Sequence, residues 1–477
     1  MRDALRKLEN IARRLDPEPA AVASLSEEVY AYAHEYLRQM PGLHAFNGEA
    51  SAGDGSQFAL DERPADLGAA LALLNESVTL PGIRPAAPGH FGYIPGGGLF
   101  PSALGDFIAD IVNSYSGLYF ASPGAALMER ELVRWMCDLV GYPGTAGGDL
   151  TSGGSIANLS ALVTAREVHG IRARDVEKTV VYLTEHSHHC LEKALHVAGL
   201  AECVVRRVPT DERWRMDATS LDQMVASDRR DGLNPWLVVG TAGTTDTGSV
   251  DPLRSIADIA DAQKLWFHCD AAYGGFFLLT DHGQEKLAGI HRSQSAVMDP
   301  HKGLFLPSGT GALVVRDERQ LAAAHTASAH YMQDAHDSAT VFSPAELGPE
   351  LTRPFRGLRM WLPLKLFGLE AFCACLEEKL LLARYFHSEL SKVPGFVLGP
   401  EPELSVVTYR YLPETGDADD FNRRLLRAVH EDGKVFITST MLDARFTLRF
   451  AALNFRSHLD QVDYLLELLA REARRLR

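Results

Sequence analysis

The chain has 477 residues, of which 46% are hydrophobic and 23% charged, as in a globular protein with two or three domains and a large core. The formal net charge of −15 opposes nucleic acid or an anionic membrane as the main partner. The charged N-terminus has no apolar core of a secretory signal, and no uncharged apolar stretch approaches the ~18 residues of a membrane span.

The cysteine pattern bears on the compartment. The six cysteines form no CxxC pair, which indicates neither a zinc ribbon nor a disulfide framework. We therefore expect reduced thiols and a cytoplasmic protein without a membrane anchor. The cysteines are Cys137, Cys190, Cys203, Cys269, Cys373 and Cys375.

The first part of the chain reads as helices joined by loops. A helix is expected over residues 24–40, with Ser26 as its N-cap, because apolar residues recur there at helical spacing. Residues 81–98 are rich in proline and glycine and cannot form regular structure. Two further helices are expected over residues 103–120 and 124–141.

From about residue 148, short apolar runs alternate with helical patterns. This alternation predicts βαβ units and a mostly parallel sheet with helices on both faces, whose ligands bind at the carboxyl ends of the strands. The expected strands lie within residues 179–184, 201–209, 235–243, 265–275, 295–302 and 311–317.

The remaining chain predicts a long polar loop and then an α+β region. Residues 325–353 are interrupted and polar, and loops of this length in compact domains are often functional lids. We expect an α/β fold in three parts: a helical N-terminal segment, a large α/β domain and a small C-terminal α+β domain. Their boundaries are expected at residues 1–85, 86–345 and 346–477.

A glycine-rich turn opens the helix after residue 151. Two glycines allow a tight turn, two serines offer hydroxyls, and the free amides of a helix start favour an anion such as phosphate. A plain capped helix start is the alternative. The residues are Ser152, Gly153, Gly154 and Ser155.

Three histidines, His186, His188 and His189, crowd the loop after the strand at 179–184. Three interpretations are open. The histidines could ligate a metal ion, one imidazole could stack on an aromatic cofactor, or all three could be surface residues. No carboxylate or cysteine stands at a convincing spacing, so we predict no metal site.

Asp270 and Lys302 follow two later strands. Asp270 ends an apolar strand, and a buried carboxylate needs a cationic partner such as a protonated pyridine nitrogen. The alternative is an aspartate that caps the next turn. Lys302 stands in apolar surroundings that would lower its pKa and make the amine a nucleophile, unless it snorkels to the surface.

These four features together describe one ligand. A phosphate site, a carboxylate for a ring nitrogen, an imidazole for a ring face and a buried lysine for an aldehyde match pyridoxal 5′-phosphate (PLP). No single motif is specific, but four at successive strand ends are.

The motifs "TSGGSIANL", "TEHSHHCLEKA", "GTAGTTDTGSVDPL", "WFHCDAAYGG" and "DPHKG" resemble those of the group II PLP-dependent amino-acid decarboxylases, which include aromatic-L-amino-acid, histidine and glutamate decarboxylases. The resemblance covers nearly the whole chain, and it implies that the N-terminal segment serves in dimerisation and that the large domain binds PLP. It implies a PLP enzyme of fold type I, a homodimer with active sites at the subunit interface, and conversion of an L-amino acid to its amine and CO2.

The resemblance also implies roles for residues around the ring. Lys302 would form the Schiff base with PLP, Asp270 would pair with the pyridine nitrogen, and His188 would stack on the ring. Ala272 would pack on the opposite face. The turn from Ser152 to Ser155 would cradle the phosphate.

Other roles concern the rim and the substrate. The resemblance places Thr244 and His301 near the cofactor. It also implies that Arg449 binds the carboxylate of the substrate. Phe91 and Tyr93 match a substrate-side loop that reaches across the dimer.

The sequence departs from the family in its mobile loop, where a tyrosine is expected to return the proton to the substrate. That position falls near Ser343–Pro344, with Phe342 beside it, and Tyr331 would substitute only in a differently shaped loop. In family members with phenylalanine here, the carbanion meets oxygen. Oxygen-dependent decarboxylation–deamination to an aldehyde is therefore the first alternative.

Asp299 is a second departure, since many relatives have asparagine before "PHK". We expect its carboxylate to point away from the phosphate or to bind through a donor.

Other functions stay open. Another PLP lyase, a desulfurase or a transaminase would keep the fold, although no cysteine lies in the 325–353 loop for a desulfurase. A non-enzymatic binding protein is disfavoured by the intact Lys302 and Asp270. An aromatic substrate is favoured because no extra basic residue is placed for a side-chain carboxylate. Several aromatic residues would form an aromatic pocket, with core packing as the alternative, namely Phe91, Tyr93, Phe100, Tyr119 and Phe120.

Overall fold

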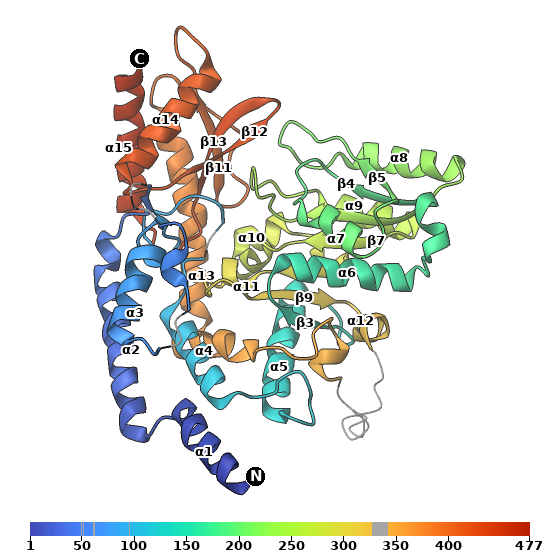
Figure 1. Ribbon diagram of the computed structural model, residues 1–477. Coiled ribbons are helices and arrows are strands. Elements are labelled where there is room, and N and C mark those ends of the chain that lie inside the picture. The colour runs from blue at the N-terminus through green and yellow to red at the C-terminus, as the bar shows by residue number, and fades with distance from the viewer. Residues whose placement is uncertain (49, 51, 61–62, 95, 327–341) are drawn as a thin grey trace.

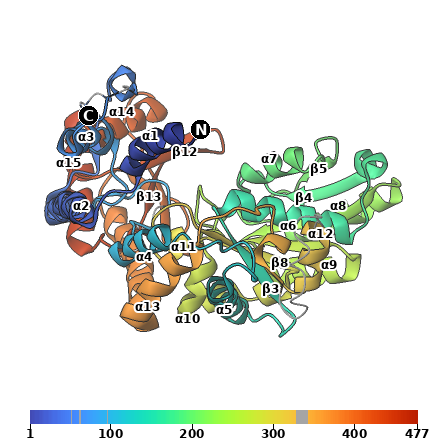
Figure 2. The same ribbon diagram turned by 60° about the horizontal axis from the view of Figure 1, so that its bottom comes forward.

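The computed structural model describes the whole chain except residues 49, 51, 61–62, 95 and 327–341. Two lobes are evident in both views (Figure 1, Figure 2). One lobe contains the large sheet and its helices, and the other contains the N-terminal helices beside the C-terminal domain.

The N-terminal helices lie against the C-terminal part of the same chain. Backbone amides of Ala45 and Phe46 donate to the carbonyls of Lys434 and Gly433, and Ala45 and Ala87 pack on Phe436. The elements of this region are α1 (Arg2–Ala12), α2 (Pro19–Gln39), the short pair β1 (Phe46–Asn47) and β2 (Gly82–Ile83), α3 (Leu67–Leu74), α4 (Phe100–Val112) and α5 (Pro123–Val140).

The large domain is built on a seven-stranded sheet of order β3-β9-β8-β7-β6-β4-β5. The five strands from β8 to β5 are parallel, whereas β9 is antiparallel to both of its neighbours. The predicted α/β fold with a mostly parallel sheet is confirmed. The strands are β3 (Gly147–Thr151), β4 (Thr179–Leu183), β5 (Val204–Arg207), β6 (Asn234–Thr241), β7 (Trp266–Asp270), β8 (Ser295–Met298) and β9 (Gly311–Val315).

Helices cover both faces of this sheet, so its strands are buried on both sides. Successive residues of β7 show this, because Trp266 belongs to one core cluster and Phe267 to the other. The helices are α6 (Gly154–Val168), α7 (Cys190–Val197), α8 (Ala218–Arg230), α9 (Leu253–Gln263), α10 (Asp281–Lys286), α11 (Pro300–Gly303) and α12 (Glu318–His325).

A long helix, α13 (Arg356–Ser391), leads into the C-terminal domain and bends at Gly368. There an antiparallel four-stranded sheet of order β10-β11-β13-β12 packs against helices. Its elements are β10 (Phe396–Leu398), β11 (Val406–Tyr411), α14 (Ala418–Asp432), β12 (Thr438–Leu442), β13 (Arg445–Ala451) and α15 (Leu459–Leu476).

Several expectations about local structure are wrong. The helix expected over residues 103–120 is α4, which ends at Val112, and the stretch at 81–98 that was expected to lack regular structure contains β2. Ser26 does not cap a helix, because α2 begins at Pro19 and the Ser26 hydroxyl donates to the Val22 carbonyl inside it. The strand β3 was not expected, since two glycines and an aspartate give it low strand propensity, and it forms by pairing with β9.

A separate finding concerns membranes. In the part of the chain that the structure describes, no helix combines the length and apolar character that crossing a lipid bilayer requires.

Candidate active site

A cavity of about 310 Å³ lies at the carboxyl ends of the parallel strands, beside the start of α6. Such a strand edge is where α/β sheets bind their ligands. Five stretches far apart in the sequence meet there, and they bring together nine of the predicted site residues. These are Ser152, Gly153, Gly154, Ser155, His188, Asp270, Ala272, His301 and Lys302.

Lys302 lies in the short helix α11 with its side chain 23% exposed, and its Nζ is 3.0 Å from Asp299 Oδ2. Burial acts to lower the pKa of this ammonium, but the Asp299 and Asp270 carboxylates outweigh burial and raise the pKa above its usual value. The expected low pKa is therefore wrong for the chain without its ligand, because the surroundings are acidic rather than apolar.

Asp299 faces into the cavity. Its Oδ2 accepts from Lys302, and its expected placement relative to the phosphate stays a prediction. Its buried Oδ1 has no hydrogen-bond partner among the described residues. A Cβ on Gly154 would lie 2.9 Å from Asp299 Oδ2 and 3.3 Å from the Ala272 Cβ, so only glycine leaves this space free.

Asp270 is 5% exposed at the end of β7. Its Oδ1 accepts from the Ala272 amide at 3.2 Å and its Oδ2 from Asn158 Nδ2 at 3.4 Å. Within the described residues no ion pair to Asp270 is formed, so a cationic ring nitrogen would supply the partner that a buried carboxylate requires.

His188 presents a defined tautomer. Its Nδ1 accepts from the Cys190 amide at 3.2 Å, which leaves the ring proton on Nε2. Burial, partly offset by Asp270, lowers the pKa of this imidazole. The ring is therefore neutral at neutral pH and suited to lie on a flat aromatic ligand.

The start of α6 completes the cavity. This 15-residue helix begins at Gly154, and its first amides have no carbonyl partner within the helix. With the hydroxyls of Ser152 and Ser155 beside them, these amides would hold a phosphate. The residues present thus fit a phosphorylated pyridine aldehyde such as PLP.

Several lining residues were not predicted, namely Ile156, Asn158, Cys190, Thr241, Gly243, Thr245, Tyr273 and Gly309. Asn158 could have been recognised, because it lies one helical turn after Gly154 and so faces the same side of α6. The others follow from how the strand ends meet.

Thr244, predicted near the cofactor, is not among the lining residues. Its Oγ1 turns to the Thr247 hydroxyl at 2.7 Å, while Thr241 and Thr245 line the cavity instead. The tight turn after β6 directs alternate side chains to opposite sides.

Phe91 does not reach the cavity either. It is fully buried in the C-terminal core, with its ring 4.7 Å from that of Phe450. A role of Phe91 in substrate binding is therefore contradicted. Tyr93 is 56% exposed with φ of 52°, so it faces solvent in the single chain.

Arg449 is buried in β13, and its side chain binds the turn at Thr245 and Asp246 instead of facing an open pocket. Its guanidinium donates to the carbonyls of Thr245 and Asp246 and, at 2.7 Å, to Thr438 Oγ1. Arg449 does not itself line the cavity, whereas Thr245, whose carbonyl it binds, does. The contacts use three of the five guanidinium N–H groups, so direct contact with a substrate carboxylate would not require Arg449 to leave these acceptors.

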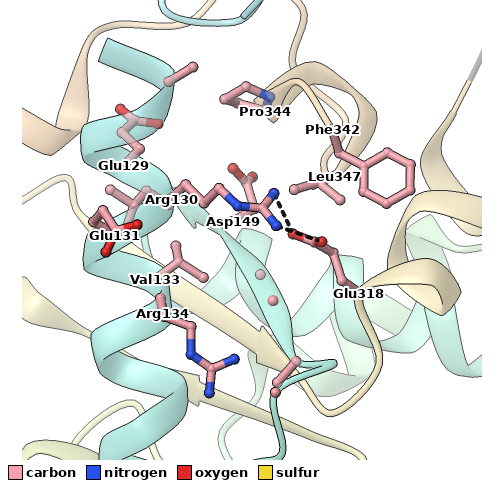
Figure 3. Close-up of a pocket in the computed structure, with 16 residues that line it drawn as sticks. Glu129, Arg130, Glu131, Val133, Arg134, Asp149, Glu318, Phe342, Pro344 and Leu347 are labelled. Atoms are coloured by element: carbon pink, nitrogen blue, oxygen red, sulfur yellow. Dashed lines mark hydrogen bonds and ion pairs between the residues drawn. The ribbon is translucent and has the colours of Figure 1, made fainter. Parts of the chain in front are cut away.

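The position at which the family's loop tyrosine was expected, Ser343–Pro344, does not line the cavity that contains Lys302. Ser343 and Pro344 are buried, and Phe342 and Pro344 line a second pocket of about 110 Å³ between α5, β3 and α12 (Figure 3). Arg130 and Glu318 form an ion pair at this pocket. Tyr331 lies outside the described residues.

Comparison with known proteins agrees with this geometry. A family model, the pyridoxal-dependent decarboxylase conserved domain, matches residues 69–412. An aromatic-L-amino-acid decarboxylase of Bacillus atrophaeus is 31% identical over 380 residues, which cover 79% of each chain. A phenylacetaldehyde synthase of Arabidopsis thaliana is 28% identical over 387 residues, covering 78% of this chain and 79% of the relative.

Solved structures include a neighbour of the same fold. The crystal structure of Oryza sativa TDC with PLP and tryptamine has a TM-score of 0.90 at 25% identity, and the match covers 96% of this chain and 99% of that chain.

Proposed function

The chain belongs to the pyridoxal-dependent decarboxylase family, and on this premise we propose that it removes the α-carboxylate of an aromatic L-amino acid as CO2 and releases the amine. Family membership makes it a PLP-dependent carboxy-lyase of amino-acid metabolism. The convergence of Lys302, Asp270 and His188 on one cavity beside a helix start supports the proposal.

We assign the binding of PLP to the residues of this cavity. Lys302 would hold the aldehyde carbon and Asp270 the pyridine nitrogen, while His188 and Ala272 would lie on opposite ring faces. The α6 amides with Ser152 and Ser155 would hold the phosphate, and His301 would close the rim.

When bound, PLP supplies an aldehyde for the substrate amine and a protonated ring that accepts the electron pair of the broken bond. The chain supplies orientation and proton control. Lys302 must give up a proton before its amine can act, and Asp299 is the nearest carboxylate. The Nε2–H of His188 is free to donate to the substrate carboxylate, and Asp270 keeps the ring nitrogen charged.

The substrate class is proposed from relatives and from the rim of the site. The Bacillus atrophaeus relative is an aromatic-L-amino-acid decarboxylase, and the solved Oryza sativa structure holds tryptamine. The exposed Tyr93 would contribute an aromatic contact to the site of a second subunit. Arg449 would act on the substrate through Thr245, with direct carboxylate binding as the alternative.

The experiment is a product analysis. The purified chain with PLP is offered L-Tyr, L-Trp, L-Phe, L-Dopa, L-His, L-Glu and L-Asp, with and without oxygen, and products are read by mass spectrometry. Amine and CO2 in both atmospheres would support the proposal. A keto acid would indicate a transaminase, and no product from any aromatic substrate would contradict the substrate class.

Lys302→Ala is the matched variant. We expect it to bind PLP without the visible absorbance of the covalent link and to form no product. Survival of that absorbance would contradict the assignment of Lys302.

Oxygen-dependent formation of an aldehyde is the second candidate. No tyrosine occupies residues 342–344, and one relative is a phenylacetaldehyde synthase. This reaction consumes O2 and water and releases CO2, ammonia and hydrogen peroxide. Aldehyde formed in air, with peroxide in equal amount, would favour it over simple decarboxylation.

Three further assignments complete the proposal. We propose a homodimer with shared active sites, a cytoplasmic location in keeping with six free cysteines, and the domain division at residues 1–85, 86–345 and 346–477.

A further inference from the structure

A buried hydrogen-bond chain runs through the core to the carboxylate of Asp270. Trp266, His268 and Asp270 are alternate residues of β7 and therefore point to one face of the sheet. Helix α6 covers that face and contributes Asn158, while Ser295 opens the neighbouring strand β8. His268, Asn158 and Ser295 are fully buried.

The contacts of this chain are continuous. Trp266 Nε1 donates to Ser295 Oγ at 2.9 Å, and His268 Nδ1 lies 2.8 Å from the same oxygen. His268 Nε2 lies 2.7 Å from Asn158 Oδ1. Asn158 Nδ2 then reaches Asp270 Oδ2 at 3.4 Å and the Gly154 carbonyl at 2.9 Å.

Only one pattern of donors satisfies every member. Asn158 turns its NH2 toward two oxygens, those of Gly154 and Asp270, so its carbonyl oxygen faces His268 and His268 Nε2 must carry the proton. Burial lowers the pKa of His268 to about 4, so the ring is neutral and its Nδ1 accepts from the Ser295 hydroxyl. Ser295 Oγ in turn accepts from Trp266.

We propose that His268 and Asn158 are positioning residues that fix the Asp270 carboxylate opposite the ring nitrogen of PLP. The proposal rests on the assignment of PLP to this cavity. His268 does not line the cavity and acts only through Asn158, which does. Because Asn158 binds both Gly154 and Asp270, it also sets the spacing between the phosphate cradle and the ring-nitrogen site.

The consequence concerns the strength of the contact with the ring nitrogen. With one oxygen held by the Ala272 amide and the other by Asn158, the carboxylate cannot rotate away. A carboxylate held in this way interacts better with a charged ring nitrogen than a mobile one, since no ordering is needed on binding.

The test compares two ligands on the full-length protein freed of PLP. The probes are PLP and 1-deazapyridoxal phosphate, which has a carbon in place of the ring nitrogen, and dissociation constants are read from protein fluorescence. The variants are Asn158→Ala, His268→Phe and His268→Gln, since glutamine retains an N–H for Asn158. Ser160→Ala is the control, because the Ser160 hydroxyl is buried in α6 without a partner among the described residues.

We expect Asn158→Ala and His268→Phe to weaken PLP about tenfold or more, as the loss of a hydrogen bond to a charged group does, and to weaken 1-deazapyridoxal phosphate much less. His268→Gln should restore part of the loss, and Ser160→Ala should bind like the wild type. Equal losses for both ligands, or none for either, would overturn the proposal. If His268→Phe does not fold, Asn158→Ala decides the question by the same comparison.

A failure of the PLP assignment, on which the proposed function rests, looks different. In that case the wild-type chain would bind neither ligand, whereas failure of the positioning role alone leaves wild-type PLP binding intact.

Discussion

The charge of Lys302 depends on its neighbour Asp299, 3.0 Å away. Asp299→Asn removes one of the two negative charges that raise the pKa of Lys302, so the pKa should fall. More amine is then neutral at a given pH, and capture of PLP should reach its maximal rate at lower pH. Stopped-flow absorbance of the covalent link across a pH series measures this.

The control for this variant is Glu285→Gln, which removes an exposed carboxylate. It should follow the wild-type pH profile. If Asp299→Asn shifts the profile to higher pH, Asp299 helps to remove the proton from Lys302 instead of holding it.

For single residues, the sequence predicts well which of them lie at the site. It predicts less well the direction in which each side chain points. Lys302, Asp270 and His188 were recognisable because their chemistry is unusual at strand ends. Phe91 was misassigned because a buried aromatic residue in a glycine-rich loop has the same pattern whether it faces a ligand or the core. Arg449 donates to the carbonyls of Thr245 and Asp246, which lie far away in the sequence, so no local pattern could predict these contacts.

At the scale of elements, a buried cation ties the segment before α13 to the sheet. Arg353 donates to Glu129 at 2.8 Å on α5, to Asp149 on β3 and to the Leu150 carbonyl at 2.7 Å. Arg353→Met would leave two buried carboxylates without their cation, which costs about 3–5 kcal/mol of unfolding free energy. Denaturant unfolding measures the loss.

This loss should depend on pH. Burial raises the pKa of Glu129 to about 6 from a usual 4.5, so its contribution to stability is full below about 4.5 and is lost as the pH rises through about 6. Without Arg353 the pKa rises further, and the variant should lose more at pH 8 than at pH 5. Arg134→Met, which removes an exposed ion pair with Asp138, should cost little at either pH.

The bend in α13 supplies a second test at this scale. Gly368 has φ of 67° and ψ of 173°, a region almost exclusive to glycine, although a Cβ at this position would meet no neighbouring atom within 4 Å. Gly368→Ala should therefore destabilise by about 1–3 kcal/mol through backbone strain alone. Thermal and denaturant unfolding report it.

Gly124→Ala is the matched variant, because Gly124 also has open space around it but lies in the first turn of α5 without a positive φ. It should be neutral or stabilising by up to about 1 kcal/mol. Similar losses at both positions would contradict an origin in backbone conformation.

Most elements of the large domain follow from alternating apolar and helical patterns, and the predicted strands match the observed ones, although β6 begins at Asn234, just before its expected range. The exceptions are informative. The strand β3 owes its form to a partner far along the chain, and the bend of α13 occurs within an otherwise continuous helical pattern. Both depend on tertiary contacts or on one dihedral angle, which periodicity does not report.

At the scale of the whole molecule, apolar side chains cluster on the outer surfaces of α1, α2 and α4. Ile111 is 72% exposed and Val112 65% exposed at the end of α4. Such a surface is typical of an interface between subunits. Replacing both residues with glutamate should convert the proposed dimer to a monomer and abolish activity, as measured by light scattering and turnover.

Val168→Glu, at the end of α6 and 43% exposed, should leave the dimer unchanged. A wild-type chain that is monomeric at micromolar concentration would contradict the homodimer, and a monomeric variant with full activity would contradict shared active sites.

The position of β3 also dictates an order of events during synthesis. Its partner β9 is made far later, with Gly147 opposite Val315 and Thr151 opposite Gly311. Non-local pairing of this kind forms slowly because a long loop must close first. A nascent chain therefore cannot secure β3, or the turn that leads from it into α6, until Val315 has left the ribosome. Cofactor capture belongs after that point, and a ribosome-bound chain stalled before Gly311 would expose the edges of both β3 and β8 to aggregation.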